Sequence, residues 1–377
     1  MRILFVSRGS AAPVFGLVPL ATAARNAGHE VLVTSTEDMV PVVTSVGLPA
    51  VPVSERSEED YGVRGRDGTP LAFPERGARE QRLFAGGWYG RLAAGCLNGL
   101  RDLTCYWRPD LIVGGRLDYA AALLAASIGV PFARQAVDIG EWSEVDEGAA
   151  AELAPELAGL GVDTIPGPDL AIEICPPSLR PAGAPEAEYM RWRPGNTQRR
   201  VEPWMLTRGS RPRVVVTAGS RATPEQHVDY LRPLIEAVHG LGAEVLVAVP
   251  KALAEAVAPI AGRSRVGWIP LDVVAPTCDL FVHHAGGTTS FAAMDSGVPQ
   301  LVVPEEDATF DLGRRMDAAG VAIALHPDDL TAQSAGDACR RLLQEPSYRI
   351  RAAEVAAEIR SMTPPSETVR RLEKLAG

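Results

Sequence analysis

The stretch that decides the fold lies in the second half of the chain, where residues 265–304 read RVGWIPLDVVAPTCDLFVHHAGGTTSFAAMDSGVPQLVVP. Two short runs, residues 279–284 and 300–304, are rich in β-branched and aromatic side chains and are bounded by turn residues, which predicts two buried strands. Between them, a Gly-Gly turn precedes a helix that we expect over residues 288–296. A strand, a turn, a helix and a second strand make the repeating unit of a parallel α/β sheet.

The same alternation continues outward over the whole chain. In the second half, strands are expected at residues 213–220, 244–250 and 265–268, with helices over residues 228–241 and from residue 252. The first half repeats the pattern, with expected strands at residues 2–7, 30–35, 50–54, 110–115 and 131–136, and a helix over residues 17–27. We therefore predict an α/β protein with two Rossmann-like domains.

A proline-rich stretch over residues 176–212 separates the two halves. We place the first domain at residues 1–205 and the second at 206–360, and expect a last helix, residues 361–377, to pack back on the first domain. Residues 55–81 are polar and have no sustained period, so they are expected to form a mobile flap.

Composition excludes several classes of function. The chain of 377 residues has a formal net charge of -10 and no Lys/Arg run, which disfavours nucleic-acid binding. Its five cysteines are scattered and include no CxxC pair, so we expect neither disulfides nor zinc, and a reducing cytoplasm. No run of about 18 apolar residues occurs, so no membrane span is expected. A homodimer is the expectation for oligomeric state.

The Gly-Gly turn is the strongest candidate for a ligand site. At a helix start, backbone N–H groups lack partners and the helix dipole is positive, so a diphosphate fits there, and Gly286 and Gly287 allow its close approach. A bare turn of this kind is more often routine, with a threonine cap. Two adjacent histidines, His283 and His284, at the carboxyl end of a strand favour the ligand site.

Trp268 follows a predicted strand and precedes a proline. A tryptophan there can stack on a nucleobase while the backbone of Ile269 reads the edge of the base. The alternative is a tryptophan of the core or of a domain interface, and the sequence leaves both open.

These motifs also resemble a known family. The runs GWIPLDVVAPTCDLFVHHAGG and SGVPQLVVP are similar to the donor-binding signature of family 1 glycosyltransferases, which have the GT-B fold of two Rossmann-like domains facing each other across a cleft. ARNAGHEV, WRPDLIVGG and ICPPSLRPA are similar to bacterial enzymes that attach deoxysugars to aromatic polyketides. The nearest resemblance is to the urdamycin C-glycosyltransferase and its angucycline relatives.

The resemblance implies a role for individual positions. Trp268 would stack on thymine, His284 would contact the α-phosphate, and Thr289 and Ser290 would hold the β-phosphate. The implied donor site comprises Ser10, Ser220, Trp268, Ile269, His284, Gly286, Gly287, Thr288, Thr289 and Ser290.

The chain departs from the pattern of the family in three places. Many relatives have a catalytic histidine where this chain has Gly16, whereas the angucycline enzymes use an aspartate after an ARQ strand, which makes Asp138 the implied general base. Without the resemblance, an aspartate that closes a strand is more often a loop cap. Ala308-Thr309 replaces an Asp-Gln pair that binds sugar hydroxyls, which favours a deoxysugar. Thr288 stands where many relatives have glycine, which changes the local backbone.

No DxD motif or ligand cluster for a metal occurs, so we expect no metal and no cofactor besides the dTDP-sugar co-substrate. The expected reaction is inverting transfer of a deoxysugar of the D-olivose type to a phenolic aromatic polyketide in antibiotic biosynthesis. The acceptor would lie against Phe84, Trp88 and Trp142. C-glycosylation is favoured over O-glycosylation; a non-catalytic helper protein and a sugar-nucleotide epimerase are the alternatives from other classes.

Overall fold

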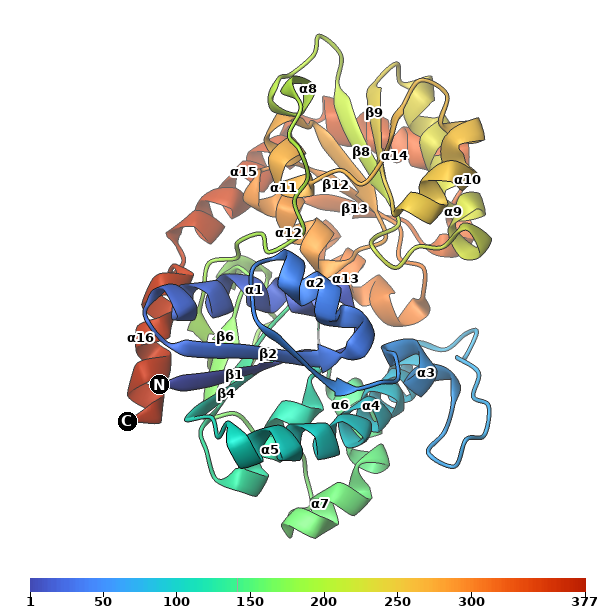
Figure 1. Cartoon of the computed structure of the whole chain (residues 1–377). Helices are drawn as coiled ribbons and strands as arrows, with labels where there is room; N and C mark the ends of the chain where they lie inside the picture. Colours follow the sequence, from blue (N-terminus) through green and yellow to red (C-terminus); the bar gives the residue numbers. More distant parts are fainter. Residues whose placement is uncertain (141) are drawn as a thin grey trace. The chain divides into compact units, whose positions relative to one another are not determined.

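The computed structural model describes residues 1–140 and 142–377, and these form two compact units (Figure 1). Unit 1 comprises residues 1–175, 182–197 and 362–377, and unit 2 comprises residues 176–181 and 198–361. The predicted boundary at residue 205 therefore differs from the structure, where unit 2 takes over at Gln198 and also includes a short earlier segment. Each unit is built around its own parallel sheet, as the sequence predicted.

Unit 1 contains a parallel sheet with the strand order β3-β2-β1-β4-β5-β6-β7. The first five strands confirm the prediction, and each is short and contains buried residues; Ile3 to Val6 of β1, for example, are all buried. Two further strands, β6 and β7, were not predicted because they are short and partly exposed. The strands are β1 (Arg2–Val6), β2 (Glu30–Thr36), β3 (Ala50–Ser54), β4 (Leu111–Gly115), β5 (Phe132–Gln135), β6 (Leu170–Glu173) and β7 (Glu188–Tyr189).

Helices pack against this sheet. The last of them, α16, packs against α1 and lies beside the amino terminus of the chain (Figure 1). The helices of unit 1 are α1 (Ala11–Asn26), α2 (Val40–Ser45), α3 (Glu58–Val63), α4 (Ala78–Tyr106), α5 (Tyr119–Ile128), α6 (Ser143–Glu152), α7 (Ala154–Leu160) and α16 (Pro365–Ala376), with a 3-10 turn η1 (Glu37–Met39).

Part of the expected flap is an ordered helix. Ser57 and Asp60 form a capping box at the start of α3, in which each side chain bonds the backbone N–H of the other residue. The Trp88 ring of α4 lies against Gly62 of α3, where an added Cβ would come within 2.6 Å of the indole. The capping signal was present in the sequence, but a helix of one and a half turns has too few residues to establish a period.

Unit 2 contains a parallel sheet with the strand order β10-β9-β8-β11-β12-β13. Five of its strands confirm the prediction, whereas β13 is a three-residue edge strand that was not predicted. The strands are β8 (Arg213–Thr217), β9 (Glu244–Ala248), β10 (Arg265–Gly267), β11 (Leu280–His283), β12 (Gln300–Val302) and β13 (Ala322–Ala324). The helices are α8 (Pro203–Leu206), α9 (Pro224–Gly240), α10 (Lys251–Ala261), α11 (Leu271–Val274), α12 (Gly287–Asp295), α13 (Asp307–Ala318), α14 (Ala332–Gln344) and α15 (Pro346–Ser361), with 3-10 turns η2 (Pro177–Leu179), η3 (Ala275–Thr277) and η4 (Pro327–Asp329).

Each sheet has a point where the strand order reverses. In unit 1 the reversal lies between β1 and β4, and in unit 2 it lies between β8 and β11. Ligands of open parallel sheets bind outside the carboxyl ends of the strands at such a point. The turns that follow these four strands are therefore the first places to look for a site.

Across the two described stretches of the chain, no helix is both long and apolar enough to cross a membrane.

Candidate functional site

The turn after β11 has the geometry of an anion site. Ala285 adopts a left-handed conformation, with φ 66°, which is strained for a residue with a side chain. Gly286 then caps α12, and the first N–H groups of this helix have no carbonyl partner within the helix. Strain and free backbone donors at a sheet reversal are typical of a site for phosphate groups.

His284 is held in place by two glycines. A Cβ on Gly219, in the turn after β8, would lie 2.5 Å from His284 Cε1, and one on Gly286 would lie 2.4 Å from its Nε2. The imidazole therefore occupies a slot between the two turns that flank the sheet reversal. Burial, followed by the neighbouring His283, lowers the pKa of His284 to about 3, so the ring is neutral at pH 7.

The neighbouring His283 has a structural role. It is fully buried, its Nε2 lies 2.8 Å from Gln300 Oε1, and its Nδ1 accepts a hydrogen bond from the backbone N–H of Ala285. The Gln300 contact assigns the proton to Nε2. Of the two adjacent histidines, only His284 is placed for a ligand.

We expect His283 to make unit 2 sensitive to acid. Burial lowers its pKa to about 4 in the folded chain, against about 6.5 when unfolded. The unfolded state thus binds the proton more readily, and stability that is complete above pH 6.5 is lost as the pH falls towards 4, by about 3 kcal/mol. The contribution of His283 to this loss is measured by urea denaturation of the wild type and of His283→Gln at several pH values between 7 and 4. If the two stability profiles run parallel, the burial of His283 has no such effect.

The side chains of α12 that were predicted to contact phosphate are not all free to do so. The Ser290 hydroxyl donates to the backbone oxygen of Gly286 at 3.0 Å, and this side chain is 1% exposed, so its proton is already engaged. Thr289 is buried as well, and Thr288 is partly exposed. The N–H groups that open α12 are thus better placed than the Ser290 hydroxyl to hold a phosphate.

The remaining predicted donor residues lie after other strands of unit 2. Ser220 is exposed in the turn after β8, and Trp268 follows β10 as a partly buried side chain. The backbone oxygen of Trp268 accepts a hydrogen bond from Arg199 Nη1 at 2.9 Å. Ile269 belongs to the core, with 6% exposure. Because the strands are parallel, all these turns meet at the same edge of the sheet.

Sequence reasoning missed a polar pair at that edge. Glu305 follows β12, and its carboxylate lies 3.1 Å from His227 Nε2 of α9. Burial raises the pKa of Glu305. The position of Glu305 just after a predicted strand was a usable signal, whereas the contact with His227 depends on tertiary structure.

In unit 1, Asp138 lies at the corresponding edge, after β5. Its Oδ1 accepts hydrogen bonds from the Gly140 backbone N–H at 2.9 Å and from the Trp142 indole Nε1 at 3.0 Å. Burial raises the pKa of Asp138, which the two hydrogen bonds and the charges of Arg8 and Arg116 partly oppose. Trp142 thus orients the carboxylate, a contact different from the predicted stacking on an acceptor.

Gly16 lies beside the segment that carries Asp138. A Cβ on Gly16 would be 3.1 Å from Val137 Cγ1, and the Gln135 side chain donates to the Gly16 backbone oxygen at 2.7 Å. The position where many relatives carry a histidine therefore faces the residue before Asp138.

The other predicted residues of unit 1 have packing roles in the structure. Trp88 donates its indole N–H to the Glu58 backbone oxygen at 2.6 Å, and Phe84 packs edge to face on Phe73 at 5.3 Å. Both side chains thereby hold the segment that was expected to be a flap. Ser10 is the N-cap residue of α1 and is 5% exposed, and within the described residues its side chain makes no capping hydrogen bond there.

A second feature that the sequence did not reveal is a cluster of buried charges at the reversal of the unit 1 sheet. Arg8 follows β1, Asp118 follows β4, and Glu58 begins α3. The Arg8 side chain is 12% exposed, whereas Glu58 is fully buried. Within the residues that the structure describes, no three His, Cys, Asp or Glu side chains are grouped as metal ligands would be.

Comparison with known proteins places the chain in a family. A family model described as "Erythromycin biosynthesis protein CIII-like, N-terminal domain" matches residues 22–219, and the corresponding C-terminal model matches residues 232–375. The chain belongs to the EryCIII-like family. Like other members, it is a glycosyltransferase of antibiotic biosynthesis with the GT-B fold.

Individual EryCIII-like relatives match over nearly their whole length. The L-demethylnoviosyl transferase of Streptomyces niveus is 34% identical over 97% of this chain and 100% of its own. The elloramycin glycosyltransferase ElmGT of Streptomyces olivaceus is 30% identical over 100% of this chain and 98% of its own. The structure of the Streptomyces sp. SF2575 glycosyltransferase SsfS6, complexed with thymidine diphosphate, is similar with a TM-score of 0.87 and 33% identity, over 99% of each chain.

Proposed function

We propose that this EryCIII-like glycosyltransferase transfers a deoxysugar from a dTDP-sugar to a phenolic aromatic polyketide, with inversion and without a metal. The observation that carries the proposal is the carboxylate of Asp138, which is held by two hydrogen bonds to one oxygen at the carboxyl edge of the unit 1 sheet. A fixed carboxylate with a raised pKa is suited to accept the proton of a weakly acidic hydroxyl group.

Asp138 would act as the general base. Since Oδ1 is occupied by Gly140 and Trp142, Oδ2 is the oxygen that would accept the phenolic proton. The electron pair of the phenolate would form the bond to the anomeric carbon while the bond from that carbon to the diphosphate oxygen breaks. The neutral His284 and the N–H groups of α12 would stabilise the departing diphosphate.

Gly16 supports this assignment of the base. In relatives with a histidine at this position, the imidazole would project towards the end of β5, because Gly16 faces Val137. A carboxylate from the segment after β5 would therefore act in the same part of unit 1 in which a histidine from α1 acts in those relatives. The base would thus come from the segment after β5 and not from α1, but it would act in the same part of unit 1.

We propose that the dTDP-sugar donor binds to unit 2. Thymidine diphosphate is the ligand of the similar SsfS6 structure. In this chain, the turn after β11 offers backbone N–H groups at the start of α12, which suit a diphosphate. Ala308 and Thr309 stand where the resemblance implies an Asp-Gln pair that accepts hydrogen bonds from sugar hydroxyls. The side chain of Ala308 lies outside the described part of the chain. The Thr309 hydroxyl donates to the backbone oxygen of Glu306 at 3.0 Å, so it offers a sugar hydroxyl only the lone pairs of one neutral oxygen, a weaker acceptor than a carboxylate.

We propose a C-glycoside as the product. A phenolate delocalises its charge onto the ortho carbon, so complete removal of the proton by Asp138 would make that carbon a nucleophile. After carbon attack, the proton of that carbon would pass to solvent and the ring oxygen would take back a proton from Asp138, which restores the aromatic phenol and the free carboxylate. The O-glycoside is the alternative, from the same donor and the same base.

One assay tests substrate and product together. With dTDP-olivose and a panel of angucyclinone and anthracyclinone acceptors, we expect transfer at a kcat/KM at least about tenfold above that with dTDP-glucose. The product should survive acid hydrolysis, because a C–C bond has no glycosidic oxygen to protonate. An acid-labile product would identify an O-glycosyltransferase. Release of nucleotide without any acceptor would contradict the proposal and favour an epimerase.

A further inference from the structure

The side chain that orients Asp138 stands at the start of a helix. The Trp142 indole Nε1 donates to Asp138 Oδ1 at 3.0 Å, and the indole packs on Gly140, where an added Cβ would come within 2.4 Å of Trp142 Cε2. The backbone oxygen of Trp142 accepts the hydrogen bond from Asp146 N, at 2.8 Å, that closes the first turn of α6. A shift of this turn would therefore move the indole relative to Asp138.

Asp146 attaches this first turn to the edge of the unit 1 sheet. Its Oδ1 accepts from Arg116 Nη1 at 3.0 Å and its Oδ2 from Arg116 Nη2 at 2.6 Å, and Oδ1 also accepts from the Tyr119 hydroxyl at 2.8 Å. A parallel pair of hydrogen bonds fixes the orientation of both groups. Arg116 directly follows β4, and Tyr119 begins α5. The start of α6 is thus held at the carboxyl end of the strand that pairs with β5, after which Asp138 lies.

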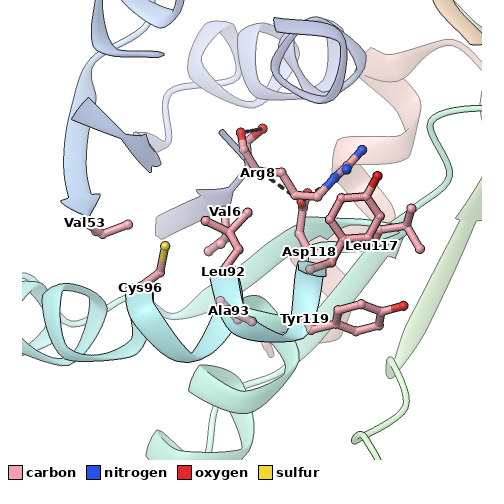
Figure 2. A pocket seen from close by; sticks show the side chains of 12 residues that line it. Val6, Arg8, Val53, Leu92, Ala93, Cys96, Leu117, Asp118 and Tyr119 are labelled. Atoms are coloured by element: carbon pink, nitrogen blue, oxygen red, sulfur yellow. Dashed lines mark hydrogen bonds and ion pairs between the residues drawn. The ribbon is translucent and has the colours of Figure 1, made fainter. Parts of the chain in front are cut away.

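The donors that hold Asp146 are well shielded from water. Tyr119 is 4% exposed and the Arg116 side chain 20%. Figure 2 shows Tyr119 beside Asp118, with its hydroxyl directed away from Cys96. Burial, followed by the charge of Asp146, raises the pKa of Tyr119, so its hydroxyl remains a donor at pH 7. An ion pair on the surface restrains its partners weakly, whereas three hydrogen bonds, one from a buried hydroxyl, restrain this single carboxylate.

Two neighbouring carboxylates of α6 have different partners. Glu144 pairs with Arg82, and Glu147 pairs with Arg79 at 2.9 Å. Both arginines belong to α4, so these pairs connect α6 to another helix and not to the turn after β4. The Glu147 side chain is also 56% exposed. Glu147 is therefore a matched control for Asp146, with the same charge on the same helix.

We propose that Asp146 is a positioning residue for sugar transfer. Held by Arg116 and Tyr119, it fixes the start of α6. Trp142, at that start, then keeps Asp138 in the orientation in which Oδ2 accepts the proton of the acceptor. This inference rests on the proposed function, because it takes Asp138 as the general base, and it extends the base to a chain of contacts that reaches the turn after β4.

Asp146→Asn tests the proposal in the full-length chain with dTDP-olivose and a phenolic acceptor. The amide has the size of the carboxylate, but it cannot accept the parallel pair of hydrogen bonds from Arg116. We expect kcat to fall about 10- to 100-fold, because a small displacement of a reacting group slows the chemical step. The affinity for thymidine diphosphate should not change. Tyr119→Phe removes one hydrogen bond and no charge, and should lower kcat about 2- to 10-fold.

A double-mutant cycle separates this role from a general loss of structure. Trp142→Phe removes the indole N–H, so in this background Asp146 has no donor left to position. Asp146→Asn should then lower kcat by no more than about twofold further. Glu147→Gln should leave kcat unchanged. Effects of Asp146→Asn and Trp142→Phe that multiply would overturn the proposal, because Asp146 would then act independently of Trp142.

The indole N–H of Trp142 provides a measurement that needs no transferase activity. Its NMR signal in the isotope-labelled chain is assigned by its loss in Trp142→Phe, and in the wild type it should shift as Asp138 titrates. In Asp146→Asn, the indole proton should exchange with solvent at least about tenfold faster, because the hydrogen bond to Asp138 is formed less often. Glu147→Gln should keep the exchange rate of the wild type. Thermal denaturation checks each variant, and Tyr119→Phe carries the test if Asp146→Asn does not fold.

The possible failures can be distinguished. If the wild type transfers sugar and folded Asp146→Asn keeps both its kcat and its indole exchange rate, the inference about Asp146 is wrong and the proposed function stands. A lower kcat with unchanged indole exchange also overturns the inference, since Asp146 would not act through Trp142. If the exchange rate depends on Asp146 but no acceptor receives sugar, the proposed function is wrong and the positioning of Trp142 by Asp146 stands.

Discussion

Replacement of Asp138 by asparagine is expected to lower kcat by about 10²–10⁴-fold and to leave the affinity for thymidine diphosphate unchanged. The side-chain amide has nearly the same shape, and its oxygen can still accept the hydrogen bonds from Gly140 and Trp142. It cannot accept the phenolic proton, so the loss is confined to the chemical step. Initial rates with dTDP-olivose and a phenolic acceptor, together with calorimetry of nucleotide binding, measure the two quantities.

Asp163→Asn is the matched control for this experiment. Asp163 is an exposed carboxylate of the same unit, so the change of charge is the same and no contact with the site is removed. Its kcat should equal that of the wild type. A folded Asp138→Asn variant with wild-type kcat would show that another group takes the proton. A wild-type chain with no measurable transfer to any phenolic acceptor would instead favour the non-catalytic helper.

The second large effect concerns the slot that holds His284. In Gly286→Ala, the new Cβ would lie 2.4 Å from His284 Nε2, so the imidazole must move. The backbone itself tolerates alanine, because Gly286 has φ −62°. Loss of a hydrogen bond from His284 to a charged phosphate should weaken the binding of thymidine diphosphate by about 10- to 100-fold. Isothermal titration calorimetry measures this loss directly.

A double-mutant cycle isolates the cause. His284→Ala removes the ring, and in its absence the Gly286→Ala methyl group has nothing to displace. The double variant should therefore bind thymidine diphosphate no more weakly than His284→Ala alone. Gly240→Ala is the control, since a Cβ there meets no atom within 4 Å. If Gly286→Ala and the wild type bind thymidine diphosphate with equal affinity, His284 and the turn after β11 are not part of the donor site.

The sequence predicted the position of His283 and His284 but not the separate role of each histidine. The sequence placed a His-His pair at the end of a strand, and the pair is there. Consecutive residues of a strand point to opposite faces, so one ring meets Gln300 in the interior and the other enters the slot at Gly219 and Gly286. Which ring does which depends on the neighbouring strand and helix, which local sequence does not specify.

Asp138 shows a similar division. Its position after an ARQ strand made it the candidate base, but the hydrogen bond from Trp142 and the proximity of Gly16 to Val137 appear only when β5 is placed in the sheet. The predicted acceptor residues Trp88 and Phe84 proved to be packed against α3 and the segment that precedes α4. An aromatic side chain in a sequence indicates a large apolar contact but not the partner of that contact.

The sequence by itself determined the two parallel α/β sheets and the turn between β11 and α12, because buried strands, glycine turns and helix starts are encoded by residues that are close together in the chain. Tertiary structure alone decided the short strands β6, β7 and β13, the slot around His284 and the grouping of Arg8, Glu58 and Asp118. The last three residues come from separate segments, and only the order of strands in the sheet brings their charges within reach of one another.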